Sequence, residues 1–444
     1  MYTSEKYWYI PQPSSDLSRK PTFERVSQVK FYNEYFPSSH RIFDPTWYQD
    51  LGMYDKNKKF LGLYRVNRVS VPIQMMAVDI ILAHLLGNKT YLVDGTLKEN
   101  AALPLYKEYW EDINMDTGRY DLIRGVLALA DGAILFYKED KKLKWQVLSM
   151  FTNDVFNMEY DKYGKPLKFY KFYDNKCDVY DKQSCTTYKI GETWTKVTQE
   201  LHGFNGIPAV YRKRESGSLT TRAQSNIDNM EVMLSRLSED NRKKFKSLYH
   251  LKTRDPQSVK TESSGLTDMI VTDQDGDFKL ISGADMSEQF KFEFDTQMKL
   301  IFNSLGIVFP EHKSSGDMPT GSMKMMFYPT ERVVMSLIHE FDSMIDEMNE
   351  IVKQGFVMEY PNQLELITKG NIRASIKMFT PQDDASKVDS LVKLREKKAI
   401  SSETIADEAP YAANNEQIRL KNEQKSDMEE EIELERRKAD LRLI

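Results

Sequence analysis

The feature that most constrains this chain is a long amphipathic segment near its middle. From Ile227 to Leu248, apolar side chains recur at steps of three and four residues, except across Asn241. These side chains are Ile227, Met230, Leu234, Leu237, Phe245 and Leu248. The spacing predicts an α-helix of about 22 residues, ~33 Å long. A helix with such an apolar seam needs neighbours along its whole length, so we expect long helices that pack side by side.

A second long helix is predicted after a small insertion. Helical spacing resumes at Phe290 and continues through Phe294, Met298, Ile301 and Leu305, which lie on one face. Between Lys252 and Asp285 the chain is irregular or β-like. Within this stretch Asp275-Gly276 indicates a hairpin from Met269 to Ile281. We therefore expect two helices that flank a small β-containing insertion.

A loop and a third helix follow. Residues 307–321 contain two prolines and two glycines, so they cannot continue either neighbouring helix and should form a loop. A helical pattern then extends to about Gln354, and Pro329 near its start should kink or restart it. Its expected apolar face consists of Val334, Ile338, Phe341, Ile345, Met348 and Val352. A strand at Ile372–Phe379 and helices beyond residue 381 complete the prediction.

The first half of the chain predicts mixed α and β structure. Helices are expected at Ile73–Leu86, Leu103–Met115 and Asp121–Ala130, a hairpin at Ala133–Tyr137 and Trp145–Phe151, and strands at Leu167–Tyr173 and Cys185–Ile190. Pro208 fixes its own φ and disfavours helix at Ile207, so Phe204–Tyr211 should form a turn that enters an extended segment. These elements predict an α+β fold.

Charge and composition argue against several classes of protein. The chain has 62 Lys and Arg residues against 67 Asp and Glu residues, a formal charge of −5, whereas tight nucleic-acid binders normally carry a basic surface. Cys177 and Cys185 are its only cysteines, which indicates structural thiols and synthesis in a reducing cytoplasm. The first residues lack a secretory-signal pattern, and the most apolar run, Val71–Leu86, is broken by polar residues. We expect neither export nor a membrane span.

Three motifs that would carry chemistry are incomplete. Gly316–Gly321 has the two glycines of a P-loop, but Ser322 stands where Lys is needed. His339 begins like a zinc-protease helix, but Ser343 occupies the position of the second histidine. Asp273–Asp277 resembles a calcium loop with its glycine at the wrong offset. The sequence therefore predicts no catalytic residue, no metal site and no cofactor.

A basic cluster lies at the end of the first long helix and consists of Arg242, Lys243, Lys244 and Lys246. It has two interpretations: a solvated helix face, as most such charge runs are, or contacts with nucleic-acid phosphates. Successive residues of a helix are rotated by about 100°, so the four cannot all face one direction, and Phe245 should take the packed face. The four cations are candidate phosphate contacts.

Three passages carry a likeness to a known family. They are Phe204–Tyr211 followed by Ser225–Asn241, Ser314–Lys324 between two helices, and Phe379–Asp384 followed by Lys398–Ile405, Pro410 and Glu416–Arg419. In this order they resemble the portal proteins of tailed bacteriophages. In that family an extended proline segment leads to a stem helix, a loop faces a central tunnel, and an Ile-Ser-x-Glu-Thr motif precedes an acidic helix.

The resemblance implies a portal-type ring subunit with an α/β wing, a long helical stem, a small β-containing clip, a tunnel loop and a helical C-terminal crown. The implied parts are residues 1–225 (N-terminal segment and wing), 226–248 (stem helix), 249–286 (clip), 287–305 (stem helix), 306–321 (tunnel loop), 322–380 (kinked helix and wing strand) and 381–444 (crown). The loop residues that would face DNA are His312, Lys313, Ser314, Ser315, Gly316, Asp317, Met318, Pro319 and Thr320.

The implied function is that of a bacteriophage portal protein, not of an enzyme. A ring, expected to be a dodecamer, would occupy one capsid vertex of the virion and serve DNA packaging, retention and ejection. Its implied partners are further copies of itself, double-stranded DNA contacted without sequence preference, the terminase large subunit, the major capsid protein and head-completion or tail adaptor proteins. No membrane is implied, and assembly would occur in the host cytoplasm.

Two alternative functions remain open from the sequence. Another phage assembly protein, such as a scaffold or tail adaptor, fits the charged C-terminal tail but not the tunnel-loop pattern. A nucleic-acid enzyme such as a nuclease would need clustered carboxylates to hold metal ions. The nearest such group is Asp342, Asp346, Glu347 and Glu350, whose helical spacing predicts solvated surface instead.

Overall fold

A computed structural model describes residues 26–54, 58–95, 100–140, 142–190, 194–244, 247–252, 254, 267–272, 287–308, 320–379, 384–397, 399–400 and 405. The chain divides into two compact units. The first comprises residues 1–309 and 329–379, and the second comprises residues 310–328 and 380–444. Helices and sheets both contribute to the first unit, which confirms the α+β prediction.

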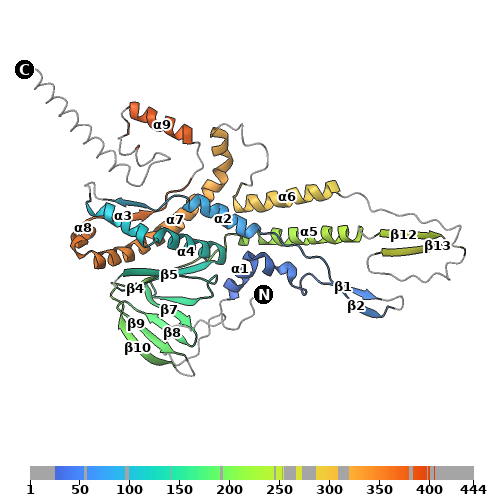
Figure 1. Cartoon of the computed structure of the whole chain (residues 1–444), viewed down its shortest axis with the longest axis horizontal. Coiled ribbons are helices and arrows are strands. Elements are labelled where there is room, and N and C mark those ends of the chain that lie inside the picture. The colour runs from blue at the N-terminus through green and yellow to red at the C-terminus, as the bar shows by residue number, and fades with distance from the viewer. Residues whose placement is uncertain are drawn as a thin grey trace, which may run out of the picture. The chain divides into compact units, whose positions relative to one another are not determined.

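A helical layer forms the centre of the first unit (Figure 1). Its helices are α1 (Val26–Tyr35), α2 (Ile73–Leu86), α3 (Ala102–Asp112) and α4 (Met115–Leu129). Helix α4 is the most enclosed of them, with Leu122, Ile123 and Val126 fully buried. It is bounded by Asn114 and Ala130, both in the left-handed region at φ values of 55° and 65°. The three helices predicted for this part of the chain are confirmed, and α2 has the predicted bounds.

A three-stranded antiparallel sheet covers α4. It has the order β11–β4–β5, formed by β11 (Ala209–Lys213), β4 (Asp131–Glu139) and β5 (Lys142–Leu148). Strand β4 is buried on both faces, because Ile134 and Phe136 join the helical core while Ala133 and Leu135 join a second apolar cluster. The predicted β4–β5 hairpin and the extended segment after Pro208 are confirmed.

The second apolar cluster connects β4 to a five-stranded antiparallel meander. This meander has the order β10–β9–β8–β7–β6, formed by β6 (Val155–Tyr160), β7 (Pro166–Tyr173), β8 (Lys176–Tyr180), β9 (Ser184–Lys189) and β10 (Thr195–Leu201). Phe156 of β6 and Phe169 of β7 supply the buried rings that contact β4's cluster. The two strands predicted here correspond to β7 and β9. A helical layer, a small sheet and a meander thus form successive layers of this unit.

Two long helices extend from the layered core (Figure 1), namely α5 (Gln224–Lys244) and α6 (Ser287–Leu305). Helix α6 has the predicted bounds. Helix α5 ends four residues earlier than predicted, because Leu248 belongs to strand β12 (Ser247–Lys252). The aromatic and apolar residues of β12 pair with β13 (Thr267–Thr272), which outweighs continuation of the helix.

The second half of the predicted hairpin around Asp275-Gly276 cannot be compared with the structure. Its first part forms strand β13, which pairs in parallel with β12. Residues 273–286 lie outside the described residues. An Asp-Gly turn indicates pairing only between the strands that it joins, so it could not predict the parallel pairing of β13 with the earlier strand β12.

Helix α7 (Thr320–Glu359) continues through Pro329 as one helix of 40 residues. It ends five residues beyond the predicted Gln354, and of its predicted apolar face only Ile338 is not buried. Of the predicted strand Ile372–Phe379, only β14 (Ile372–Ser375) is regular, and it pairs antiparallel with β3 (Tyr91–Asp94). The described residues also form strands β1 (Leu51–Tyr54) and β2 (Phe60–Tyr64) and helices α8 (Leu364–Lys369) and α9 (Asp384–Glu396). Their 3-10 turns are η2 (Pro37–Ser39), η3 (Arg41–Phe43), η4 (Thr221–Ala223) and η7 (Pro361–Gln363).

Both cysteines are unpaired structural thiols in the meander, as predicted. Cys177 of β8 is buried, and burial, followed by the neighbouring Asp178 carboxylate, raises the pKa of its thiol well above the usual range. The same two causes raise the pKa of Cys185 on β9 to about 11. Both thiols therefore stay protonated near neutral pH, which keeps them unreactive.

We predict that the meander loses stability at alkaline pH. The folded state retains thiol protons that the unfolded chain releases from about pH 8.5 upward, so the unfolding free energy falls as pH rises through and above that value. Urea unfolding followed at pH 7.5 and pH 10 should show a lower midpoint at pH 10, and a Cys177→Ala variant should show a smaller decrease. An unchanged or higher midpoint at pH 10 would contradict the burial of these thiols.

Candidate functional site

Helix α5 carries a buried polar stripe that its apolar seam did not predict. Glu231, Ser235 and Glu239 recur every four residues, so they lie on one side of the helix. All three are nearly inaccessible to solvent, with exposed fractions of 1%, 0% and 5%. A buried carboxylate is costly unless it accepts hydrogen bonds, so this stripe requires partners from another part of the chain.

The partners come from residues 64–71, an extended segment that we call the strap. The Val71 N–H donates to Glu231 Oε1 (2.9 Å), and the Val69 N–H donates to Ser235 Oγ (2.9 Å). Glu239 accepts from the Asn67 N–H at 3.1 Å and from the Tyr64 hydroxyl. Later strap residues bind earlier turns of α5, so the strap runs antiparallel to the helix. The helix side chains thus replace the partners that a neighbouring strand would supply.

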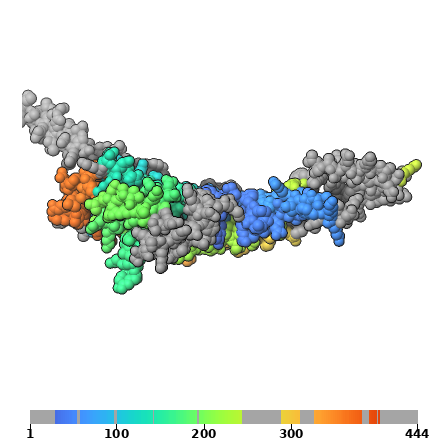
Figure 2. All heavy atoms as spheres, turned by 90° about the horizontal axis from the view of Figure 1, so that it is seen from below, coloured from blue at the N-terminus to red at the C-terminus, as the bar shows by residue number. Residues whose placement is uncertain are grey.

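The contacts between the strap and Glu231, Ser235 and Glu239 of α5 together form what we call the clamp. His40 adds a contact at its most enclosed residue, Glu231. Its Nδ1 lies 2.5 Å from Glu231 Oε1, and both side chains are at most 2% exposed. Because a carboxylate oxygen only accepts, this ring nitrogen donates. Glu231 therefore connects the segment before β1 and the strap to α5. In the space-filling view the described residues before α2, coloured blue, lie beside the yellow-green residues of α5 (Figure 2).

Arg242 extends the clamp toward the end of α5. Its guanidinium donates to Asn67 Oδ1 at 3.0 Å and to the Arg65 carbonyl at 3.4 Å. The guanidinium carbon also lies 4.5 Å from the centroid of the Tyr64 ring. These contacts occupy one side of Arg242, whose side chain remains 41% exposed. Of the candidate phosphate contacts, Arg242 is therefore held by the strap.

The other candidates have less structural description. Lys243 and Lys244 belong to the last turn of α5, where cations also interact favourably with the helix dipole, but their side chains lie outside the described residues. Lys246 lies outside them entirely. Of the expected tunnel loop, His312–Pro319 also lies outside the described residues, and Thr320 is the first residue of α7. The basic cluster and the loop therefore remain predictions from the sequence.

The acidic group on α7 is not the purely solvated face that the sequence predicted. Asp342 Oδ1 accepts from the Ile376 N–H at 3.0 Å, and Asp346 Oδ1 accepts from the Ala374 N–H at 3.2 Å. These two carboxylates fasten β14 and the residue that follows it to α7. Helical spacing missed this role because a carboxylate bound to a distant backbone and a hydrated one give the same pattern.

The other two acids of this group, Glu347 and Glu350, have exposed carboxylates that form ion pairs. Glu347 lies 3.4 Å from Arg212, and Glu350 lies 2.7 Å from Lys353. Within the described ranges, no three His, Cys, Asp or Glu side chains gather closely enough to hold a metal ion. The α7 carboxylates therefore hold structure together rather than forming a metal-binding cluster.

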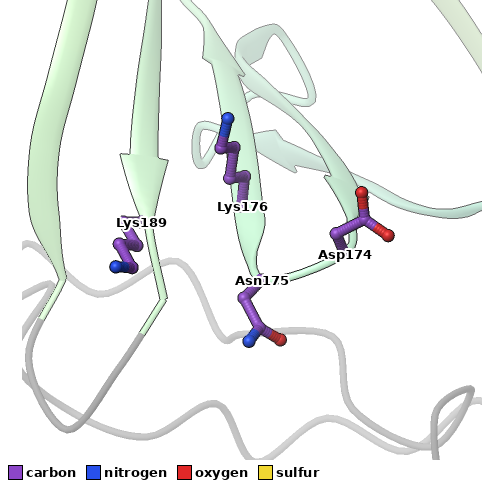
Figure 3. A pocket seen from close by; sticks show the side chains of 4 residues that line it. All are labelled: Asp174, Asn175, Lys176 and Lys189. Carbon is purple, nitrogen blue, oxygen red and sulfur yellow. The ribbon is translucent and has the colours of Figure 1, made fainter.

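A cavity of about 390 Å³ lies beside the turn between β7 and β8 (Figure 3). Asp174, Asn175, Lys176 and Lys189 line it, and all four are exposed. Lys176 and Lys189 are cross-strand partners on β8 and β9. A ligand pocket normally combines buried apolar walls with a few convergent polar groups. This lining offers no buried group, so it does not define a binding site.

These features describe a protein built around long helices, one of which, α5, is held along its length by the strap. A family model described as "Phage portal protein, SPP1 Gp6-like" matches residues 22–434, and no curated protein matches the chain. The chain therefore belongs to this family of phage portal proteins. Portal proteins are structural, non-enzymatic virion components of the capsid vertex that assemble as rings and serve DNA packaging. None of the described helices is both long and apolar enough to cross a membrane.

We predict that Glu231→Ala releases the strap. The substitution leaves the Val71 N–H and His40 Nδ1 unpaired in a buried site, which should cost about 3 kcal/mol. Amide hydrogen exchange at Val69 and Val71 should accelerate by about 100-fold, while exchange in α4 changes little. Glu350→Ala, which removes an exposed ion pair worth about 0.5 kcal/mol, is the matched control. Equal exchange of the strap in the two variants would show that Glu231 does not hold it.

Proposed function

We propose that this portal protein forms a closed ring of twelve copies with the α5–α6 pair in the wall of its channel. The single observation that carries the proposal is the family match over residues 22–434, which includes both helices and the segments around them. The long helices support it as well, since helices with apolar seams need lateral neighbours and a ring supplies them through repeated heterologous contacts. At −5 per chain, twelve copies carry about −60, which disfavours adhesion of DNA phosphates.

The subdivision proposed for the ring subunit follows the family pattern. Residues 1–225 and 322–380 form the wing, the two helices form the stem, residues 249–286 form the clip, residues 306–321 form the tunnel loop and residues 381–444 form the crown. The observed bounds move the first stem helix to Gln224–Lys244 and end the tunnel loop before Thr320, where α7 begins. Partners of this assembly are the terminase large subunit, the major capsid protein and head-completion or tail adaptor proteins. The subunit itself performs no hydrolysis, and assembly takes place in the host cytoplasm.

The ring is tested by its mass. Twelve copies of the 51.8 kDa chain give a species of about 620 kDa under native conditions. Native mass spectrometry at micromolar concentration should detect it, and the same preparation should hydrolyse neither ATP nor DNA. A closed ring of a different copy number would still agree with a channel. A monodisperse monomer or dimer, or hydrolysis abolished by a point substitution in this chain, would contradict the proposal.

The basic cluster is proposed to contact DNA in transit. Because the strap holds Arg242, the remaining cations Lys243, Lys244 and Lys246 are the better candidates for phosphate contact. Changing these three to Gln should leave rings intact and reduce the salt dependence of DNA association by up to about three units of slope. The matched control changes Lys162, Lys165 and Lys182, three exposed lysines of the meander, to Gln. Equal salt dependence in the two triple variants would favour the solvated-face interpretation of the cluster.

The tunnel loop is proposed to touch passing DNA without sequence preference. Its prolines exclude regular helix and its glycines permit unusual φ values, so the loop can adapt to a duplex whose symmetry differs from that of the ring. Deleting Ser314–Pro319 should preserve ring assembly, because both stem helices lie outside the deletion, but impair packaging or retention of DNA. Proheads assembled with the shortened protein should package shorter DNA or lose it. Normal packaged length and retention would leave the loop a simple connection.

A further inference from the structure

The five-stranded meander has a buried outer face, on the side opposite to β4. Residues alternate sides along β7, so Tyr170 points away from the β4 cluster that contains Phe169. The outer face carries a third apolar cluster, formed by Tyr170, Cys177 and Val179. Their exposed fractions are 2%, 0% and 7%. The outer face is therefore shielded from solvent along β7 and β8.

The described chain covers only part of this face. The connection between β9 and β10 packs on one end of it. The ring of Trp194, just before β10, lies 6.2 Å from that of Phe172 between centroids, so it covers the row of side chains that contains Cys177. Tyr170 lies one row further along β7 and is flanked within the sheet by Phe172 and Val179. Neighbours in the same sheet cover the sides of a ring but not its outward surface, so the burial of Tyr170 requires a further layer.

The attachment points of the undescribed stretches narrow the choice of covering segment. In the first unit, the stretches longer than four residues are 1–25, 255–266 and 273–286. The last two adjoin β12 and β13, which lie beyond the end of α5 that is farther from the meander (Figure 1). Residues 1–25 precede α1, where Tyr35 packs on Phe151 at 5.2 Å between ring centroids, four residues before β6. Because α1 is only about 15 Å long, residues 1–25 join the described chain close to the meander.

Composition separates the same three stretches. Residues 255–266 contain no aromatic side chain and residues 273–286 contain one, whereas residues 1–25 contain five. Four of these five lie among the first ten residues, namely Tyr2, Tyr7, Trp8 and Tyr9. Aromatic side chains bury large apolar areas and pack on other rings, which suits a face that presents Tyr170. Fully extended, 25 residues span about 80 Å, whereas five strands side by side are about 19 Å wide, so the segment also has the reach.

We propose that residues 2–10 pack over the outer face of the meander of their own chain, with their aromatic side chains on Tyr170 and Val179. The contact spans β7, β8 and β9 and stops before β10, whose seven residues are all exposed. Pro11 and Pro13 then favour an extended path toward α1. The inference concerns the subunit itself and does not depend on the ring. It makes the N-terminal segment an additional layer of the first unit, on the far side of the meander from β4.

Cys177 reports whether this face is covered. Its thiol is buried on the outer face, whereas Cys185 points to the opposite face, because its cross-strand partner Tyr180 packs against the β4 cluster. Both thiols are treated with N-ethylmaleimide at pH 8.0, and peptide mass spectrometry follows the modification rate of each. Deleting residues 2–20 should accelerate modification of Cys177 by about 100-fold, because the thiol no longer waits for local opening. The rate at Cys185 should stay unchanged.

Substitutions in the full-length chain separate uncovering from unfolding. The triple variant Tyr7→Ser, Trp8→Ser and Tyr9→Ser should accelerate modification of Cys177 by about tenfold. Tyr163→Ser, at a tyrosine 76% exposed in the β6–β7 turn, is the matched control and should have no effect. A folded deletion variant whose Cys177 reacts as slowly as in the wild type would overturn the proposal. Equal acceleration at both cysteines would overturn it too, and the triple variant decides by the same criteria if the deletion prevents folding.

A photo-cross-link identifies the chain that supplies the covering segment. In the full-length protein, Trp8→benzoylphenylalanine should on irradiation attach to β7, β8 or β9, and the product should migrate as a monomer on a denaturing gel. Peptide mapping should place the new bond near Tyr170 or Val179. Covalent dimers as the main product would overturn the assignment to the same chain, and a bond outside the meander would overturn the contact itself.

Discussion

The arrangement of the N-terminal half depends on the buried Glu231 carboxylate of α5. This side chain accepts hydrogen bonds from His40 and from the backbone of Val71, so one helix residue holds two segments that are far from it in the chain. A buried charge whose partners are removed is strongly destabilising, so such a clamp specifies one position for the strap. Together with Ser235 and Glu239, Glu231 fixes the strap along one side of α5.

That clamp connects the layered core to the proposed ring. The core fixes the start of α5 through Ile227 and Met230, which are fully buried. Beyond these residues, α5 has α6 on one side and the strap on another, while much of α6 remains exposed. The exposed apolar side chains of such a surface face water in a monomer, whereas in a ring the next copy buries them. Family membership and exposed stem surfaces therefore support the same assembly through independent arguments.

The sequence predicted those elements whose signal is local. Apolar periodicity identified α2 with its bounds, most of α6 and the apolar face of α7, and the polar turn between two apolar segments identified the β4–β5 hairpin. It failed where the partner is distant. The end of α5 depends on pairing between β12 and β13, and Asp342 and Asp346 bind backbone groups more than 25 residues away. The polar stripe of α5 looks like a solvated face in sequence, because only the strap, some 160 residues earlier, makes it buried.

Helix α5, held by the strap, is proposed to stand in the wall of a closed ring. A cryo-electron microscopy reconstruction of the purified protein, refined to side-chain detail, measures this directly. We expect a ring with a central channel, α5 and α6 in its wall, and the His40–Glu231 pair intact in every subunit. A reconstruction in which the subunits form no closed ring, or in which α5 and α6 lie outside the channel wall, would contradict it.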